Sequence, residues 1–337
     1  VRSSRRTLPR AEHRSRALVA KVFFAWELGQ GLGHLARLRP MMERAVASGH
    51  GVTLAARELA NVGRVIGDLP VTALQAPLCR RELGREEIAT QSFAQILRNC
   101  GYHDAETLTT LIAAWKHLMS LSGAELVIVD HSPTAMLAAA ALELPVVAFS
   151  SGFTHPPPGS PFGVFDAAPD AATRDALSAL DETLKSNVNR AVDRVGGAPL
   201  ETLADLYQRA DDVFFFTVPA FDHFGQRAEA KYCGVVEEFS EVGPPRWPGD
   251  GAPKLFAYLK PHRDLPHFLE QLVRLRLNVL VYHNDLPAQT VERFAGQTMR
   301  FTREPVDLRA VAEQAALAVV NANLGTSFRL LTKGVPL

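Results

Sequence analysis

Two short turns in the sequence carry the residue types that could do chemistry. The first places Gly29, Gly31 and Gly33 at alternate positions and His34 directly after them, where a leucine-rich helical pattern begins. A helix N-terminus disfavours a protonated imidazole, so a neutral His34 is suited to accept a proton as a general base. The alternative for His34 is a hydrogen bond near the helix N-terminus without any chemistry.

Asp130 is the carboxylate best placed to assist His34, because it directly follows the apolar run 125–129. Ligands of parallel sheets gather at the carboxyl ends of the strands. If the strand before Asp130 neighbours the first strand, Asp130 can hold the second ring nitrogen of His34 and stabilise a positive charge on it. A helix N-cap before Ser132 is the competing interpretation of Asp130, and both roles can hold together.

The second turn, at 321–326, reads Asn-Ala-Asn-Leu-Gly-Thr and leads into a helical pattern that runs to Lys333. Backbone N–H groups at the start of a helix form an anion site, so those of Gly325, Thr326 and Ser327 would bind a pyrophosphate group. The alternative is a plain strand-to-helix turn that Thr326 caps.

Two further side chains lie at a strand end and in a long loop. Glu27 ends the first strand, where it would contact a bound acceptor or sugar unless it is simply solvated. His155 lies in the loop 150–163, which is rich in Gly, Ser and Pro, and would line an acceptor cleft unless it is a surface residue. The chain holds no His-Glu-x-x-His and no Asp-x-Asp pattern, so no metal site is predicted.

Parallel sheets are needed to position these turns. Apolar runs without alternation, separated by helical patterns, predict strands that are buried on both faces of α/β domains. In the first domain we expect strands at 22–26, 52–56, 71–74, 125–129, 145–149, 212–217 and 232–235, and helices after His34 and at 87–99, 106–121 and 171–209. In the second we expect strands at 254–259, 278–282, 297–301 and 317–320, and helices at 265–275, at 308–316 and after Thr326.

Composition sets the expected domain boundaries. The segment 241–253 is dense in Pro and Gly and is the clearest linker. It separates an N-terminal domain, 21–240, from a C-terminal domain, 254–337. Residues 1–20 hold six arginines, one glutamate and no periodic apolar face, which predicts a disordered basic leader.

Length, charge and cysteine content exclude several classes of protein. A chain of 337 residues fits two domains, and no apolar run reaches the roughly 18–20 residues that a transmembrane segment needs. Because 36 basic and 36 acidic residues cancel, no nucleic-acid partner is expected. The three cysteines form no Cys-x-x-Cys, which favours a reducing compartment and a cytoplasmic location.

The ordered set of motifs resembles the GT-B glycosyltransferases of the UDP-glycosyltransferase type. Gly33-His34 followed by the segment 49–53, Gly-His-Gly-Val-Thr, matches the first-domain pattern of that family, and the segments 319–327 and 333–336 fall in its nucleotide- and pyrophosphate-binding region. The resemblance covers 21–337 and implies two Rossmann-like parallel-sheet domains that face a cleft. It also implies an inverting, metal-independent hexosyltransferase that needs no cofactor besides its nucleotide-sugar donor, either UDP or dTDP, and that glycosylates a hydroxyl of a small-molecule acceptor.

The same resemblance implies roles for individual residues. His34 would be the base and Asp130 its partner. The acceptor cleft would involve Glu27, Gly31, Gly33 and His155, and the donor phosphates would meet Lys260, Asn321, Asn323, Gly325, Thr326 and Ser327.

The sequence departs from the family pattern at three places. Asn321 stands where the family turn usually has histidine, and Lys260-Pro261 stands where the first strand of the second domain usually ends in Gly-Ser or Gly-Thr. The acidic or glutamine residues that hold the donor sugar in the family would come after Leu337. The second domain is therefore expected to be incomplete.

Two other functions fit parts of the sequence. A NAD(P)-dependent oxidoreductase would use the glycine loop 29–33 and Glu58 as a ribose ligand, although the spacing is Gly-x-Gly-x-Gly and not Gly-x-Gly-x-x-Gly. A non-catalytic nucleotide-sugar-binding protein would account for Asn321 and for the short second domain.

Overall fold

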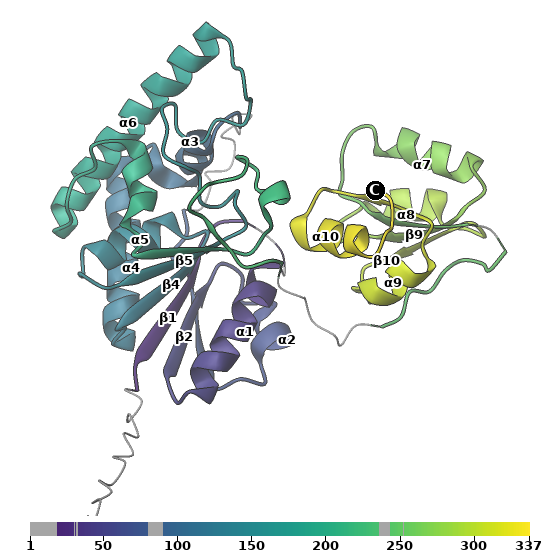
Figure 1. The fold of residues 1–337 in the computed structure, drawn as a ribbon, viewed down its shortest axis with the longest axis horizontal. Coiled ribbons are helices and arrows are strands. Elements are labelled where there is room, and N and C mark those ends of the chain that lie inside the picture. The colour runs from purple at the N-terminus through teal and green to yellow at the C-terminus, as the bar shows by residue number, and fades with distance from the viewer. Residues whose placement is uncertain (1–18, 30, 32, 80–89, 236–242, 252) are drawn as a thin grey trace, which may run out of the picture.

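The computed structural model describes residues 19–337 except 30, 32, 80–89, 236–242 and 252. Two separate parallel sheets organise the fold, one of seven strands in the order β3-β2-β1-β4-β5-β6-β7 and one of four in the order β10-β9-β8-β11. Figure 1 shows helices on both faces of each sheet. The prediction of an α/β fold with two parallel sheets is therefore confirmed. The leader 1–18 and part of the linker, 241–242 and 252, lie outside the described residues.

The first sheet takes its strands and helices from a long stretch of chain. In order they are β1 (Lys21–Trp26), α1 (Gly33–Ala47), β2 (Gly51–Ala56), α2 (Val62–Ile66), β3 (Val71–Gln75), α3 (Phe93–Leu97), the short distorted turn η1 (Arg98–Tyr102), α4 (Ala105–Ser122), β4 (Leu126–Asp130), α5 (Pro133–Ala140), β5 (Val146–Ser150), α6 (Ala171–Val195), the short helical turn η2 (Leu203–Arg209), β6 (Asp212–Phe215), the turn η3 (Pro219–Phe221) and β7 (Lys231–Tyr232).

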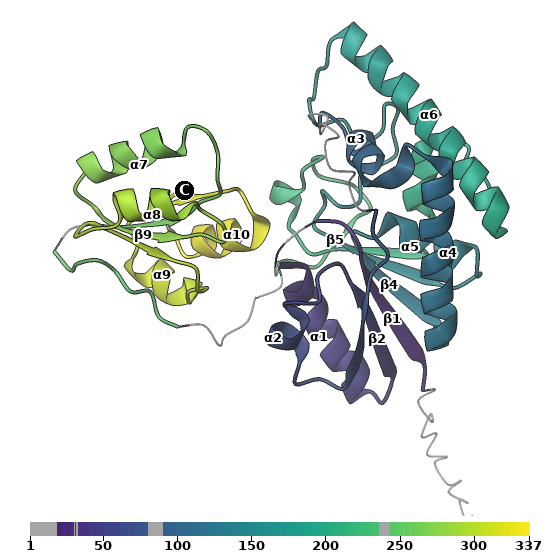
Figure 2. The same cartoon turned by 180° about the vertical axis from the view of Figure 1, so that it is seen from behind.

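The second sheet is built from the remaining elements. These are β8 (Lys254–Tyr258), α7 (Leu265–Arg274), β9 (Asn278–Tyr282), α8 (Ala288–Phe294), β10 (Met299–Thr302), α9 (Leu308–Gln314), β11 (Leu317–Val320) and α10 (Leu324–Thr332). In both views α10 is the helix of this part that lies toward the first sheet (Figures 1 and 2). The rings of Phe221 in η3 and Phe328 in α10 are in contact, with centroids 6.0 Å apart.

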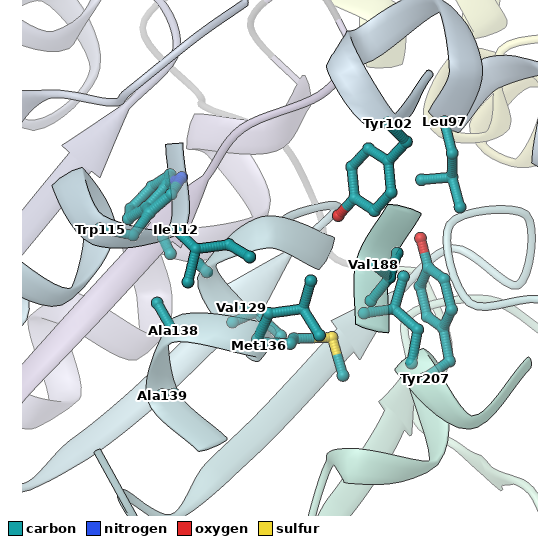
Figure 3. Packing of buried hydrophobic residues seen from close by; sticks show 14 of the residues in the cluster. Leu97, Tyr102, Ile112, Trp115, Val129, Met136, Ala138, Ala139, Val188 and Tyr207 are labelled. Carbon is teal, nitrogen blue, oxygen red and sulfur yellow. The ribbon is translucent and has the colours of Figure 1, made fainter. Parts of the chain in front are cut away.

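Strand β1 is buried on both faces of the sheet, as its unbroken apolar run predicts. Phe23 packs on one face of the sheet with Trp115 of α4, whereas Phe24 and Trp26 pack on the other face with α1. Figure 3 shows part of the hydrophobic core on the Phe23 side of the sheet, in which Ile112 and Trp115 of α4 lie near Val129 and Met136. Each large apolar side chain that is buried in this way contributes about 1.5–3 kcal/mol.

Several element predictions need correction. The helical patterns expected over 171–209 form two elements, α6 and the short helical turn η2, because Gly196 has a left-handed φ of +79° and closes α6 after Val195. The expected helix 87–99 begins only at Phe93, where Ser92 forms a capping box, and 87–89 lie outside the described residues. Helix α8 was not predicted.

The strand register brings the two halves of the predicted His-Asp pair together. β1 lies between β2 and β4, and Trp26 is paired with Asp130. The chain that leaves β1 and the chain that leaves β4 therefore start from the same level of the sheet. Between β1 and β4 the connections change direction, which is where open α/β sheets place their ligands.

Candidate active site

His34 and Asp130 are in direct contact at the carboxyl edge of the first sheet. The Nδ1 atom of His34, in the first turn of α1, lies 2.9 Å from Oδ2 of Asp130, the last residue of β4. Both are buried, with 9% and 1% of their surface exposed. Because an ionised carboxylate can only accept, Nδ1–H donates to Oδ2, and the lone pair of the neutral ring is at Nε2. His34 thus has the tautomer that a general base needs.

The alternative interpretation of Asp130 as a helix N-cap is wrong. The N-cap of α5 is Ser132, and Pro133 is the first residue of that helix. The Asp130 carboxylate is directed to α1 instead, where it binds His34 and Arg37.

Arg37 is a member of the site that sequence reasoning missed. Its Nη2 donates to both carboxylate oxygens of Asp130, at 3.2 Å to Oδ1 and 2.9 Å to Oδ2. Burial alone would raise the pKa of Asp130, but the neighbouring Arg37 and His34 hold it well below its usual value, so Asp130 is ionised. The i, i+3 spacing from His34 on a predicted helix was the signal that could have found Arg37.

The glycine turn lies over the His34 ring. Gly29 has a left-handed φ of +80°, and a Cβ built on it would overlap Nε2 of His34. Gly31 also has a left-handed φ, +94°, but no atom of the other described residues lies within 4 Å of the Cβ position there. Gly33 is the first residue of α1. The turn is therefore fitted closely to the His34 ring at Gly29 and open at Gly31.

His131 is the second residue that the sequence did not single out. It follows Asp130 with a left-handed φ of +49°, and its ring centroid lies 6.1 Å from that of His34. Only 7% of its surface is exposed, and in the described part of the chain neither ring nitrogen has a hydrogen-bond partner. Burial, with the positive charges of Arg37 and Arg57 adding to it, lowers the pKa of His131 to about 3, so the ring is neutral. Strained backbone and unpaired buried polar atoms are concentrated at functional sites.

Aromatic rings lead from His131 to the protein surface, and we call this set the aromatic cluster: Phe93, Phe153, Phe165, His223 and Phe224. Its inner members Phe93 and Phe153 lie 5.7 and 6.4 Å from the His131 ring. At the outer end, the exposed His223 contacts Phe153 at 5.1 Å and Phe165 at 5.5 Å.

A hollow of about 420 Å³ adjoins the outer end of the aromatic cluster. Phe165 lines it together with residues of the segment before α3, the segment before α6 and α6 itself, namely Thr90, Gln91, Val164, Asp166, Pro169, Asp170, Thr173 and Leu177. The cluster offers apolar, partly exposed surface, whereas the hollow beside it is lined by both polar and apolar side chains.

Glu27 is not a solvated strand end, and its placement in the acceptor cleft needs correction. Only 2% of its surface is exposed. Its Oε2 accepts from the backbone N–H of Thr134 at 2.9 Å and its Oε1 from the Thr134 hydroxyl at 2.5 Å, so the carboxylate caps helix α5. Burial raises the pKa of Glu27 to about 7, although the hydrogen bonds from Thr134 oppose this. Glu27 is a structural cap.

His155 is likewise not a surface residue. Its ring is packed edge-on against Tyr207 and Phe215, with centroids 5.2 and 6.1 Å away, and 6% of its surface is exposed. Burial, with the nearby Arg227, lowers the pKa of His155 to about 4. Its contacts place it in the packing beneath the loop 150–163, so the structure gives no support to a cleft-lining role.

The second predicted site lies at the N-terminus of α10. The helix begins at Leu324 after the N-cap Asn323, whose side chain makes no capping hydrogen bond to the backbone. Thr326 is therefore not the cap, and the Asn323 amide donates to its hydroxyl at 3.1 Å. Ser327 N–H bonds to the Asn323 carbonyl, so of the three predicted phosphate donors only Gly325 and Thr326 have backbone N–H groups in the first turn.

Polar atoms around this turn are buried without partners among the described residues. They are Nδ2 of Asn321, Oδ1 of Asn323 and Oγ of Ser327. Ala322 between them has a left-handed φ of +53°, which is rare for a residue with a side chain. Buried polar atoms are normally paired, so these atoms are available to a polar ligand.

Lys260 lies at the same edge of the second sheet as this turn. It is exposed and follows β8 by two residues, and β8 pairs with β11 with Tyr258 opposite Val320. Asn321 directly follows β11. The two residues therefore leave neighbouring strands at their carboxyl ends.

Among the described residues, two further features are absent. No group of three or more His, Cys, Asp or Glu side chains is arranged to hold a metal ion. Within the same residues, no helix has the length and apolar character needed to cross a membrane.

Comparisons with known proteins match this chain by fold and not by sequence. No protein-family model matches it, and no curated protein sequence does. The structure of CalG4, the calicheamicin glycosyltransferase, is similar with a TM-score of 0.64 and 15% identity over 95% of this chain and 79% of that chain. SnogD, a glycosyltransferase from Streptomyces nogalater, has a TM-score of 0.60 and 16% identity over 94% of this chain and 80% of its own.

A third similar structure was solved with a nucleotide. It is the spinosyn rhamnosyltransferase SpnG complexed with thymidine diphosphate, with a TM-score of 0.55 and 16% identity over 94% of this chain and 79% of that chain. The chain thus has the two-sheet GT-B fold of these glycosyltransferases, as its motif order indicated.

Proposed function

We propose that this protein is an inverting, metal-independent glycosyltransferase that moves a sugar from a nucleoside diphosphate donor to a hydroxyl of a small-molecule acceptor. The observation that carries the proposal is the buried His34–Asp130 pair at the carboxyl edge of the first sheet. The fold it shares with glycosyltransferases supports the reaction class, although fold alone does not fix function.

The proposed reaction uses His34 as the general base. Nε2 takes the proton of the acceptor hydroxyl while the oxygen attacks the anomeric carbon and the bond from that carbon to the diphosphate oxygen breaks. The single displacement inverts the anomeric configuration. Asp130, held at Nδ1, stabilises the imidazolium that results.

The donor diphosphate is assigned to the N-terminus of α10. Backbone N–H groups of Leu324, Gly325 and Thr326 and the unpaired polar atoms of Asn321 and Ser327 would receive its oxygens. Lys260, at the same sheet edge, would supply positive charge in place of a metal ion. That SpnG was solved with thymidine diphosphate supports a dTDP-linked donor, and a hexosyl or deoxyhexosyl group is the proposed sugar.

The acceptor is assigned to the first sheet. The open turn at Gly31 and Gly33 borders His34, and the aromatic cluster leads outward from His131. Apolar rings favour a hydrophobic, ring-containing acceptor, and the neutral His131 can donate one hydrogen bond to it and accept another.

Nucleotide binding and donor turnover test the proposal together. The purified chain should be stabilised against heat by dTDP or UDP, and it should release the diphosphate from a matching sugar nucleotide faster when a phenolic acceptor panel is added. Stabilisation by NAD(H) or NADP(H) instead would indicate the oxidoreductase. If the chain binds nucleotide but releases no diphosphate from any of the sugar nucleotides tested, it is a non-catalytic binding protein.

A further inference from the structure

Arg37 and His34 compete for one buried carboxylate. His34 Nδ1 and Arg37 Nη2 each lie 2.9 Å from Oδ2 of Asp130, and the two nitrogens are themselves 2.9 Å apart. Arg37 stands one turn after His34 on α1, and its side chain is 17% exposed, whereas that of Asp130 is 1% exposed. A guanidinium is thus fixed against the edge of the proposed base.

The short contact between Arg37 and His34 is not a hydrogen bond in the base-competent tautomer. Nδ1–H is directed to Asp130, so the Arg37 N–H group faces another N–H group. The opposite tautomer would place the Nδ1 lone pair against the negative Oδ2 atom at 2.9 Å, which is repulsive. Arg37 is therefore held near the ring by the carboxylate that both side chains share.

This arrangement changes what Asp130 does for His34. A carboxylate with no other partner favours the charged imidazolium, because opposite charges attract at short range. Here the Arg37 charge offsets that of Asp130 and repels a second positive charge on the ring. Of the other neighbours, His131 is neutral. Arg57, whose guanidinium donates to the backbone carbonyl of Glu27 at 2.9 Å, adds a charge of the same sign as that of Arg37.

We propose that Arg37 is a positioning residue that fixes Asp130 and keeps the His34 ring uncharged before reaction. A resting imidazolium has no lone pair at Nε2 and is not a base. The arginine would therefore extend proton acceptance by His34 toward lower pH. The catalytic consequence rests on the proposed function, but the charge on the ring does not, and it can be measured without any substrate.

NMR titration of the His34 Cε1–H signal in the full chain tests the charge directly. The signal is assigned by its loss in His34→Asn, and ring ¹⁵N shifts report the tautomer. Arg37→Met removes the positive charge. Arg37→Gln also removes the charge but keeps an N–H donor for Asp130, so it provides the same test if Arg37→Met does not fold. Arg37→Lys keeps the charge, and Arg44→Met on the exposed end of α1 is the matched control.

The proposal expects the midpoint of the His34 titration to move to higher pH by about one unit or more in the two uncharged variants. Arg37→Lys should stay near the wild-type midpoint and Arg44→Met should not move it. If the chain transfers sugar, the acidic limb of the kcat/KM profile should move in the same direction. A midpoint that is unchanged or lower in Arg37→Met and Arg37→Gln would overturn the proposal, whether or not the chain is a glycosyltransferase.

Discussion

Gly29 and His34 are fitted to one another so closely that a Cβ atom on Gly29 would lie only 2.4 Å from the His34 Nε2 atom. The backbone of Gly29 has a φ of +80°, and the same Cβ would lie 3.2 Å from Nδ1 of the neighbouring His131. Nε2 is the nitrogen that we propose takes the acceptor proton. The glycine turn of the first sheet thus lies against the proposed base, whereas the phosphate site is proposed at the second sheet.

Gly29→Ala should therefore inactivate the protein by displacing its base. Gly196→Ala at the end of α6 is the matched control, because its φ of +79° is also left-handed but no described atom lies within 4 Å of a Cβ there. Each alanine costs about 1–2 kcal/mol in backbone strain. Gly29→Ala should in addition lower turnover by about 10²-fold or more relative to Gly196→Ala. If the two variants are equally folded and have equal turnover, the contact between Gly29 and the His34 ring does not position the base.

Glu27 should make the protein less stable as pH rises toward neutrality. Its pKa is raised from 4.5 to about 7, so its contribution to stability is complete below pH 4.5 and is lost as pH rises through 7. The size of this change is at most about 3 kcal/mol. Urea unfolding at pH 5 and pH 8 should show the loss in wild type and not in Glu27→Gln, which stays neutral. A parallel pH dependence in both proteins would contradict the assignment.

His131 should have the opposite effect at acid pH. Its pKa is lowered from 6.5 to about 3, so the neutral ring contributes stability above pH 6.5 that is lost as pH falls through 3. His131→Asn suits the left-handed φ of +49° and cannot be charged. Its free energy of unfolding should fall less than that of wild type between pH 7 and pH 4. An equal fall would show that His131 is not the group responsible.

Ser327→Ala should weaken donor binding without weakening the fold. The Ser327 hydroxyl is buried and has no partner among the described residues, so its removal should leave the melting temperature of the free protein unchanged or raised. Loss of a hydrogen bond to a charged phosphate should lower dTDP affinity by about 10-fold or more. Calorimetric titration measures this, with Thr332→Ala at the far end of α10 as the control. An unchanged affinity would move the diphosphate away from this turn.

The sequence predicted the features of the fold that depend only on neighbouring residues. The apolar run of β1, the helix after His34 and the turn at 321–326 follow from patterns that lie within a few residues. The contact between His34 and Asp130 could be stated only conditionally, because it depends on β4 lying beside β1, and strand order is not written in any one segment. Arg37 was within reach of the helical spacing and was overlooked.

The burial of polar residues was the feature that the sequence predicted least well. Glu27 and His155 were expected at solvated or cleft positions, because a carboxylate at a strand end and a histidine in a loop are usually exposed. Glu27 is buried because Thr134, more than a hundred residues away in the chain, satisfies its oxygens, and His155 because Tyr207 packs against its ring. Such partners exist only in the tertiary structure.

The most direct test of the central claim compares turnover and nucleotide binding in His34→Ala. If His34 is the general base, sugar transfer should fall by about 10²–10⁴-fold, while dTDP affinity should match that of wild type, because the proposed diphosphate site lies at α10. Circular dichroism and the melting temperature confirm that the variant is folded. A folded His34→Ala protein that transfers sugar at the wild-type rate would contradict the account.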